Sequence, residues 1–268
     1  MSTSDFRSPS IVTTMITRRT VLGGGLASLA TARCLRAEPA DQFRVESSEG
    51  AIVSAHYAAS GPAKRPSVLV LHGARGVELR QRAYERYADA LTAAGIDAYL
   101  LRYFSPVDEQ AMAPTSPREA RLAHEDARIG VWAERVSAVA SAVLARSDSS
   151  GRLGLLGFSL GGFVAAATAA RDDRVAALAV LYGGMPDQIA TSVKHLPPLL
   201  ELHGDADRNV SIARGQALVR LAKTVGASAE LVTYPGKPHG FDFAENDPAA
   251  ADAVARVVGF FRERLPAA

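Results

Sequence analysis

The stretch Leu153-Gly-Leu-Leu-Gly-Phe-Ser-Leu-Gly-Gly162 decides the fold, because an apolar run ends in the pattern G-x-S-x-G and an alanine-rich helical pattern follows. A serine between the end of a strand and the start of a helix lies on a strained turn that lifts its hydroxyl clear of the sheet. Glycines flank it because side chains there would collide with the turn. Ser159 is therefore the candidate nucleophile. The alternative is a chance match in which Gly161 and Gly162 only let the helix pack closely on the sheet.

Outward from this serine, apolar strands alternate with helical patterns. We expect strands at 42–47, 52–58, 68–71, 97–102, in the run that starts at 153, and at 175–181, 199–203 and 229–234, with helices at 79–94, 118–145, 162–170, 211–225 and 247–265. Residues 103–117, rich in Pro, Ser and acidic residues, are expected to form an irregular functional loop. Strands with continuous apolar cores, separated by helices, predict an α/β fold with a mostly parallel sheet and helices on both faces.

The N-terminus carries a pattern typical of a twin-arginine export signal, Thr17-Arg-Arg-Thr-Val-Leu22. The weakly apolar stretch 21–32 that overlaps it is too short to span a bilayer as a stable helix. Cleavage after Ala37 would remove the only cysteine, Cys34, and leave a periplasmic or secreted protein without a disulfide, a thiol nucleophile or a membrane anchor. The alternative is a cytoplasmic protein with an untidy N-terminus or a true start at Met15.

Charge and composition bound the rest of the chain, which we expect to form one domain from 38 to 268. Residues 1–37 hold five of the 30 Lys and Arg and one of the 28 Asp and Glu, so the remainder carries a formal net charge of −2. A nearly neutral domain argues against a nucleic-acid partner. The chain has no H-E-x-x-H or C-x-x-C motif, and we expect no metal and no cofactor. The remaining histidines are not spaced as metal ligands: His56, His124, His195 and His203. We expect His203 to pack under the loop that carries Asp207.

A serine hydroxyl is a weak nucleophile at neutral pH, so it needs a general base and an anion that orients the base. The chain order expected for this fold is Ser, then Asp or Glu, then His. His239, just after the last strand, is the candidate base. Asp205 and Asp207 follow an earlier strand; Asp207 is the candidate acid, because such a loop places its turn first and we expect Asp205 to cap that turn through its own backbone. The alternatives are an N-cap role for Asp207 and an exposed loop position for His239.

Acyl transfer also needs donors aimed at the developing oxyanion. The candidates are the backbone N–H of Leu160, at a helix N-terminus, and that of Ala74, in His72-Gly-Ala-Arg-Gly76 after the third strand; for the latter loop the alternative is a simple strand-to-helix turn. Candidate pocket residues are two cations, Arg75 and Arg102, and three aromatic wall residues, Tyr103, Phe158 and Phe241. Solvated or salt-bridged positions for the cations and core packing for the aromatics are the alternatives.

From about Phe43 to Leu265 the chain resembles the dienelactone hydrolase family of α/β-hydrolases. The shared features are a compact length without a lid domain, G-F-S-L-G-G at the candidate nucleophile, H-G-x-x-D at Asp207 and P-H-G-F at His239. The resemblance implies an eight-stranded, mostly parallel sheet and hydrolysis of enol lactones or other esters without a cofactor.

The chain departs from the type members of that family, which use a cysteine where Ser159 stands and a glutamate where Gly73 stands. Their arginine shortly after the catalytic histidine has no counterpart in Phe241-Asp-Phe-Ala-Glu245. Loss of the cysteine and the glutamate together is coherent, because a serine does not need control of a thiolate. The same change weakens the inference that this chain shares the dienelactone substrate of the type members.

The residues and the resemblance favour a serine hydrolase acting on a small-molecule ester or lactone. His239 would deprotonate Ser159, the two amides would hold the oxyanion, and water would resolve the acyl-enzyme. A serine peptidase or acyltransferase on the same fold stays open, although peptidase relatives usually carry an extra propeller or lid domain. An exported binding protein without activity would be expected to lack a member of the triad. The sequence predicts no oligomeric state.

Overall fold

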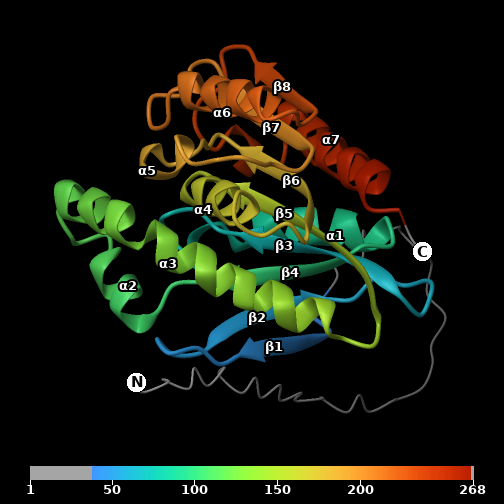
Figure 1. Ribbon diagram of the computed structural model, residues 1–268. Coiled ribbons are helices and arrows are strands. Elements are labelled where there is room, and N and C mark those ends of the chain that lie inside the picture. Colours follow the sequence, from blue (N-terminus) through green and yellow to red (C-terminus); the bar gives the residue numbers. More distant parts are fainter. Residues whose placement is uncertain (1–37, 267–268) are drawn as a thin grey trace, which may run out of the picture.

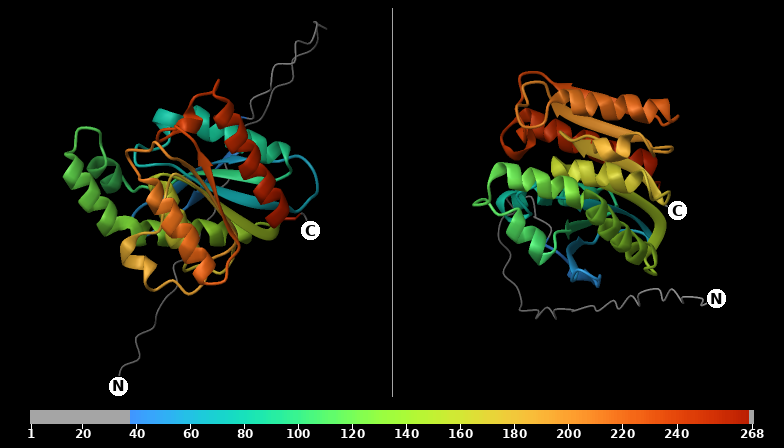
Figure 2. Two further views of the ribbon diagram at one scale, coloured as in Figure 1. Left: turned by 90° about the horizontal axis from the view of Figure 1, so that it is seen from above. Right: turned by 60° about the vertical axis from the view of Figure 1, so that its left-hand side comes forward.

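The computed structural model describes residues 38–266 and shows an eight-stranded sheet between two layers of helices (Figures 1 and 2). The strands are β1 (Asp41–Val45), β2 (Ile52–Tyr57), β3 (Arg65–Leu71), β4 (Asp97–Arg102), β5 (Ser149–Phe158), β6 (Val175–Leu181), β7 (Leu199–Gly204) and β8 (Ala229–Tyr234). The helices are α1 (Gln81–Ala93), α2 (Pro106–Ala111), α3 (Arg118–Leu144), α4 (Leu160–Ala169), α5 (Asp187–Ala190), α6 (Ile212–Thr224) and α7 (Pro248–Arg264), with 3-10 turns η1 (Glu78–Arg80) and η2 (Phe241–Phe243). The expected export signal, residues 1–37, lies outside the described residues.

The sheet has the strand order β1-β2-β4-β3-β5-β6-β7-β8. Only the pairs β1–β2 and β2–β4 are antiparallel, and the remaining pairs are parallel. This is the α/β arrangement expected from the sequence. Because the strands β3 to β8 run in one direction, the loops that follow their carboxyl ends meet along one edge of the sheet.

Two hydrophobic cores hold the layers together, one on each face of the sheet. Helices α3, α4 and α6 cover one face, where Trp132 is fully buried. Helices α1 and α7 cover the other, where Tyr87 and Phe261 are fully buried. Burial on both faces explains why the central strands are continuously apolar instead of alternating. Among residues 38–266, no helix combines the length and the apolar character that crossing a membrane requires.

Part of the segment 103–117 is a helix, so the expectation of an irregular loop is wrong there. Helix α2 starts with a capping box: the Ser105 side chain accepts from the Asp108 N–H, and the Asp108 carboxylate accepts from the Ser105 N–H. Pro106 occupies the first helical position, where its missing N–H costs nothing. The signal is present in the sequence as S-P-x-D, with Asp in the place where Glu or Gln is usual.

Candidate active site

Ser159 lies on a strained turn between β5 and α4. Its φ of 53° and ψ of −121° are rare for a residue with a side chain. A Cβ on Gly157 would lie 2.3 Å from the Gly161 carbonyl oxygen, and a Cβ on Gly161 would lie 2.4 Å from the carbonyl oxygens of Leu71 and His72. No side chain fits at either position. Gly157 is therefore required by the turn itself, and Gly161 by the close approach of α4 to the end of β3.

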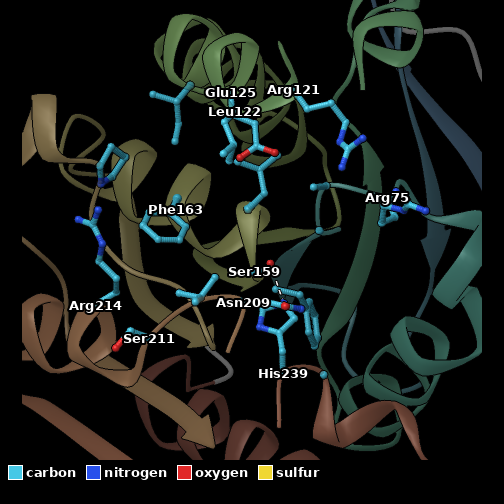
Figure 3. Close-up of a pocket in the computed structure, with 18 of the residues that line it drawn as sticks. Arg75, Arg121, Leu122, Glu125, Ser159, Phe163, Asn209, Ser211, Arg214 and His239 are labelled. Atoms are coloured by element: carbon cyan, nitrogen blue, oxygen red, sulfur yellow. Dashed lines mark hydrogen bonds between the residues drawn. The ribbon is translucent and has the colours of Figure 1, made fainter. Parts of the chain in front are cut away.

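Ser159, His239 and Asp207 form a chain of hydrogen bonds, of which Figure 3 shows the bond between Ser159 and His239. His239 Nδ1 lies 2.7 Å from Asp207 Oδ2, and His239 Nε2 lies 3.0 Å from Ser159 Oγ. An ionised carboxylate only accepts, so Nδ1 carries the proton and Nε2 presents its lone pair to the serine hydroxyl. A histidine held this way can take the hydroxyl proton while the serine oxygen attacks a carbonyl carbon.

The acid loop, which we define as residues 205–210, holds the Asp207 carboxylate tightly. The Asp207 side chain is fully buried, and its Oδ1 accepts from the N–H groups of Asn209 at 2.8 Å and Val210 at 2.9 Å. Asp207 thus organises its own turn as well as touching His239. The expectation that Asp205 caps its own turn is wrong: its carboxylate accepts from the Gly236 N–H at 2.6 Å and joins the acid loop to the loop before His239.

The two amides expected to face an oxyanion both border the cleft at Ser159. Leu160 is the first residue of α4, so its N–H has no acceptor within the helix. Ala74 lies in the turn after β3 that the bond from Gly76 N–H to Gly73 O closes at 3.1 Å. In the part of the chain that the structure describes, neither N–H has a hydrogen-bond acceptor. Both donors are thus free to bind a ligand oxygen.

The cleft has a volume of about 1070 Å³ and is bordered by Arg75 and Phe158, two of the five expected pocket residues. The expectation for Arg102, Tyr103 and Phe241 is wrong, since none of them lines the cleft. Arg102 is paired with Glu78. Tyr103 is fully buried and donates to the His72 carbonyl oxygen, and Phe241 packs against the rings of Tyr182 and Tyr234. Side chains that follow a strand end can point under the loop as well as into the cleft.

His72 supports the turn after β3 from below. Its ring stacks on Tyr103 with centroids 4.3 Å apart, and its Nδ1 donates to the Gly73 carbonyl oxygen at 2.7 Å. Burial lowers the pKa of His72 to about 4, so the ring is neutral near pH 7. This histidine therefore shapes the loop that carries the Ala74 amide.

The first turns of α3 form the wall of the cleft opposite Ser159, and the sequence did not identify them (Figure 3). Leu122 is exposed although apolar, and Glu125 points across the cleft. Burial, with a smaller contribution from Asp126, raises the pKa of Glu125 to about 7. Further lining residues not expected from the sequence include Arg121, Ile129, Phe163, Met185 and Arg214. The one available signal was a pair of large apolar residues, Leu122 and Ile129, seven residues apart in a helix start whose other residues are charged or polar side chains and alanines.

Tyr182 and Asp242 hold His239 in place and were also not expected. Tyr182 has a positive φ of 43°, and its ring centroid lies 4.5 Å from that of His239. The fully buried Asp242 accepts from the Tyr182 hydroxyl at 2.8 Å and from the Tyr87 hydroxyl at 2.9 Å. Burial raises the pKa of Asp242. The segment after His239 is thereby pinned to β6 and α1.

Among the described residues, no group of three or more His, Cys, Asp or Glu side chains has the geometry of a metal site.

Comparison with known proteins gives both a family and a fold. The sequence matches the model of the dienelactone hydrolase family over residues 53–265. The structure is similar to dienelactone hydrolase from Anabaena variabilis ATCC 29413, with a TM-score of 0.66 and 24% identity over 84% of this chain and 97% of that one. It is also similar to Est1E from Butyrivibrio proteoclasticus, with a TM-score of 0.64 and 16% identity over 83% and 98% of the two chains.

A third similar structure is the acylaminoacyl peptidase of Pyrococcus horikoshii, with a TM-score of 0.65 and 14% identity. The likeness covers 84% of this chain but only 41% of the peptidase. No curated protein matches the sequence. Identities this low show the fold alone, which is that of the α/β-hydrolases.

Proposed function

The chain belongs to the dienelactone hydrolase family, and on this premise we propose that it is a serine hydrolase acting on carboxylic esters or lactones. The observation that carries the proposal is the hydrogen-bonded chain from Ser159 through His239 to Asp207. It begins at a strained nucleophile position and ends at a buried carboxylate. The family and the α/β-hydrolase fold support hydrolysis, and the positions of Ser159, His239 and Asp207 suggest which group carries out each step.

In the proposed reaction, Ser159 Oγ attacks the carbonyl carbon of the substrate while His239 Nε2 takes the hydroxyl proton. The carbonyl oxygen becomes an oxyanion, which the N–H groups of Leu160 and Ala74 bind. The carbon–oxygen bond to the alcohol then breaks, and the alcohol oxygen receives the proton from His239. A water molecule repeats these steps on the acyl-enzyme and releases the acid. In a lactone, the alcohol stays attached to the acyl group.

The serine in place of the type members' cysteine is part of the proposal. A hydroxyl needs the base contact that His239 Nε2 makes at 3.0 Å, whereas a thiol can ionise by itself. Gly73 is compatible with this chemistry. A Cβ there would lie 3.4 Å from the Ser159 Cβ, so a larger side chain would crowd the nucleophile.

Labelling with a fluorophosphonate probe, followed by peptide mass spectrometry, tests the assignment. We expect one covalent adduct, on Ser159, and its loss in Ser159→Ala at unchanged thermal stability. Kinetics on a panel of p-nitrophenyl esters, lactones, aminoacyl peptides and acyl acceptors then separates the hydrolase from a peptidase or an acyltransferase. A folded wild-type protein that is neither labelled nor active on any ester or lactone would overturn the proposal.

We also propose that residues 1–37 direct export through the twin-arginine pathway. The support is the Arg18-Arg19 pair and the position of β1, which begins at Asp41, four residues after the expected cleavage site. Cleavage there would leave every described strand and helix intact. Fractionation of cells producing the full chain and its Arg18→Lys, Arg19→Lys variant checks this: we expect the wild type in the periplasm or medium and the variant in the cytoplasm.

A further inference from the structure

A second carboxylate–imidazole pair lies directly behind the acid loop. Glu201 and His203 are two residues apart on β7, so both side chains point to the same face of the sheet. Both are fully buried, and His203 Nδ1 lies 2.9 Å from Glu201 Oε1. The reaction steps given above use neither residue. Two ionisable groups in the middle of a buried strand need a physical reason.

His203 donates a hydrogen bond from its Nε2–H to the acid loop. Its Nε2 lies 2.9 Å from the carbonyl oxygen of Val210, which can only accept, so Nε2 carries a proton. The same Nε2 lies 3.4 Å from Asp207 Oδ2, the oxygen that also touches His239. Val210 in turn donates its N–H to Asp207 Oδ1 at 2.9 Å. The imidazole thus fixes both ends of the turn that presents the carboxylate.

Glu201 fixes the imidazole. Its Oε1 receives the Gly183 N–H at 3.3 Å and shares one proton with His203 Nδ1. On whichever of the two atoms that proton lies, the ring keeps its orientation and keeps the N–H on Nε2. Burial raises the pKa of Glu201. Glu201 therefore orients the His203 ring through its Nδ1, as Asp207 orients the His239 ring.

The pair is also closely covered. A Cβ on Gly215 of α6 would lie 2.7 Å from Glu201 Oε1 and 2.8 Å from His203 Nδ1, so only a glycine lets the helix approach this far. The second oxygen, Glu201 Oε2, has no hydrogen-bond partner among residues 38–266. An unpaired buried oxygen costs stability, because it gives up hydrogen bonds to water and gains none in the fold. Apolar residues would fill the same space without that cost, so the pair is poorly explained as packing.

We propose that Glu201 and His203 are positioning residues for Asp207, and through it for the general base His239. The proposal rests on the proposed function, because it assigns Asp207 the role of orienting the base. Without the Nε2–H of His203, the acid loop loses the side-chain bond that joins Val210 to β7, and the Asp207 carboxylate loses a nearby donor. His239 would then be held less well when it becomes an imidazolium, while the cleft that binds the substrate stays intact.

The test compares three variants of the full-length protein. His203→Phe keeps a ring and removes the donor, and His203→Gln restores an N–H near the position of Nε2. Glu201→Gln keeps a hydrogen bond to the ring in a side chain of the same shape. Steady-state kinetics on p-nitrophenyl acetate, expressed per site titrated with a fluorophosphonate, corrects for any unfolded fraction.

We expect kcat of His203→Phe to fall by roughly 10- to 100-fold, the scale on which misplacement by about 1 Å slows a reaction. KM of His203→Phe should stay within about twofold of the wild-type value. The kcat of His203→Gln and of Glu201→Gln should stay much closer to the wild-type value than that of His203→Phe. A merely structural role predicts fewer titrated sites with unchanged kcat. Unchanged kcat per site in His203→Phe, or no recovery in His203→Gln, would overturn the proposal. Should His203→Phe not fold, His203→Leu carries the same expectation.

A measurement without substrate separates this inference from the proposed function. The proton between His239 Nδ1 and Asp207 is expected to give a far-downfield resonance in the proton NMR spectrum. We expect it in the wild type and in His203→Gln, and expect it to be lost or broadened in His203→Phe. The resonance tests the positioning even if the wild type cleaves no ester. A resonance that is equally sharp in all three proteins contradicts the positioning role, whatever the activity.

Discussion

Asp207 and Asp108 each contact a histidine, in different parts of this molecule. Asp207 is 2.7 Å from His239, and Asp108 on α2 is 2.9 Å from His124 on α3. Both aspartate side chains are fully buried. At the first contact the other ring nitrogen reaches the hydroxyl of Ser159, whereas His124 does not line the cleft. A buried carboxylate and an imidazole thus make a candidate catalytic device only where the free nitrogen meets a nucleophile.

The second contact is a clamp between elements. Arg128 donates from Nε to Asp108 at 2.9 Å and from Nη1 to Glu49 at 2.9 Å, which ties α2 and α3 to the β1–β2 turn. Burial alone would raise the pKa of Asp108, but the hydrogen bonds from Arg128 and Ser105 outweigh it and hold that pKa well below its usual range. The partners of a buried carboxylate, and not its burial, decide whether it stabilises the fold or serves a reaction.

Replacing each aspartate by asparagine should separate the two roles most sharply. In Asp207→Asn the amide no longer fixes the Nδ1 proton, and we expect kcat on p-nitrophenyl acetate to fall by about 10⁴-fold. Asp108→Asn should keep kcat per titrated site within about twofold, because its contact is remote from Ser159. The two steady-state assays use the same ester. Comparable losses of kcat in both variants would show that the distinction between clamp and catalytic contact is wrong.

The free energy of unfolding should fall when the contact of Asp108 is broken. Asp108→Asn removes the ionised partner of Arg128 Nε and of the α2 N-terminus, while Glu49 still pairs with Arg128. We expect the free energy of unfolding to fall by about 3 kcal/mol, at the low end for breaking a buried pair because Arg128 is partly exposed and stays paired with Glu49. Urea denaturation followed by circular dichroism measures this change. The matched control is Asp187→Asn, whose exposed pair with Arg214 should contribute less than about 1 kcal/mol. Equal losses in the two variants would contradict the clamp.

The contribution of Asp108 to the free energy of unfolding should depend on pH, and the direction of its pKa shift fixes the sign of that dependence. The pKa of Asp108 is lower in the folded state than in the unfolded chain, so the folded state binds fewer protons there. The stabilisation is fully present above the unfolded pKa of about 4 and is lost as the pH falls through the lower folded value. We expect the urea midpoint of the wild type to fall more steeply below about pH 4 than that of Asp108→Asn. Parallel curves for the two proteins would exclude this contribution.

The sequence predicted the fold and that the side chains of Ser159, Asp207 and His239 lie together, because each lies in a local motif at a strand end and the chain order restricts the choice. It could not predict which aromatic side chains enter the cleft. Tyr103 and Phe158 both adjoin strand ends, yet one lies under a loop and the other borders the cleft. The direction of such a side chain depends on packing between elements far apart in the sequence, for which no local pattern exists.

The opposite wall of the cleft was missed for a related reason. Leu122 and Glu125 lie in the first turns of α3, whose polar sequence is equally typical of a solvent-exposed helix end. Only the tertiary position of α3 brings these turns opposite Ser159. The position of His203 under the acid loop was expected, and its bond to the Val210 carbonyl oxygen confirms it. Its pairing with Glu201 was missed, because two polar residues on a strand do not show in the sequence that a helix covers them.

The smallest effects should come from two glycines within helices, which probe how closely the region of Asp207 is packed. Gly259→Ala on α7 adds a Cβ with no heavy atom within 4 Å, so the gain in helix propensity should raise the free energy of unfolding by about 0.5–1 kcal/mol.

Gly215→Ala has the same intrinsic gain, but its Cβ would collide with Glu201 and His203. We expect it to lower the free energy by about 1 kcal/mol, since overpacking outweighs propensity, and to lower kcat because the pair behind Asp207 must move. Urea denaturation and ester kinetics measure both variants. If Gly215→Ala stabilised the protein as much as Gly259→Ala does, α6 would have room to retreat, and the close cover over Glu201 and His203 would not constrain Asp207.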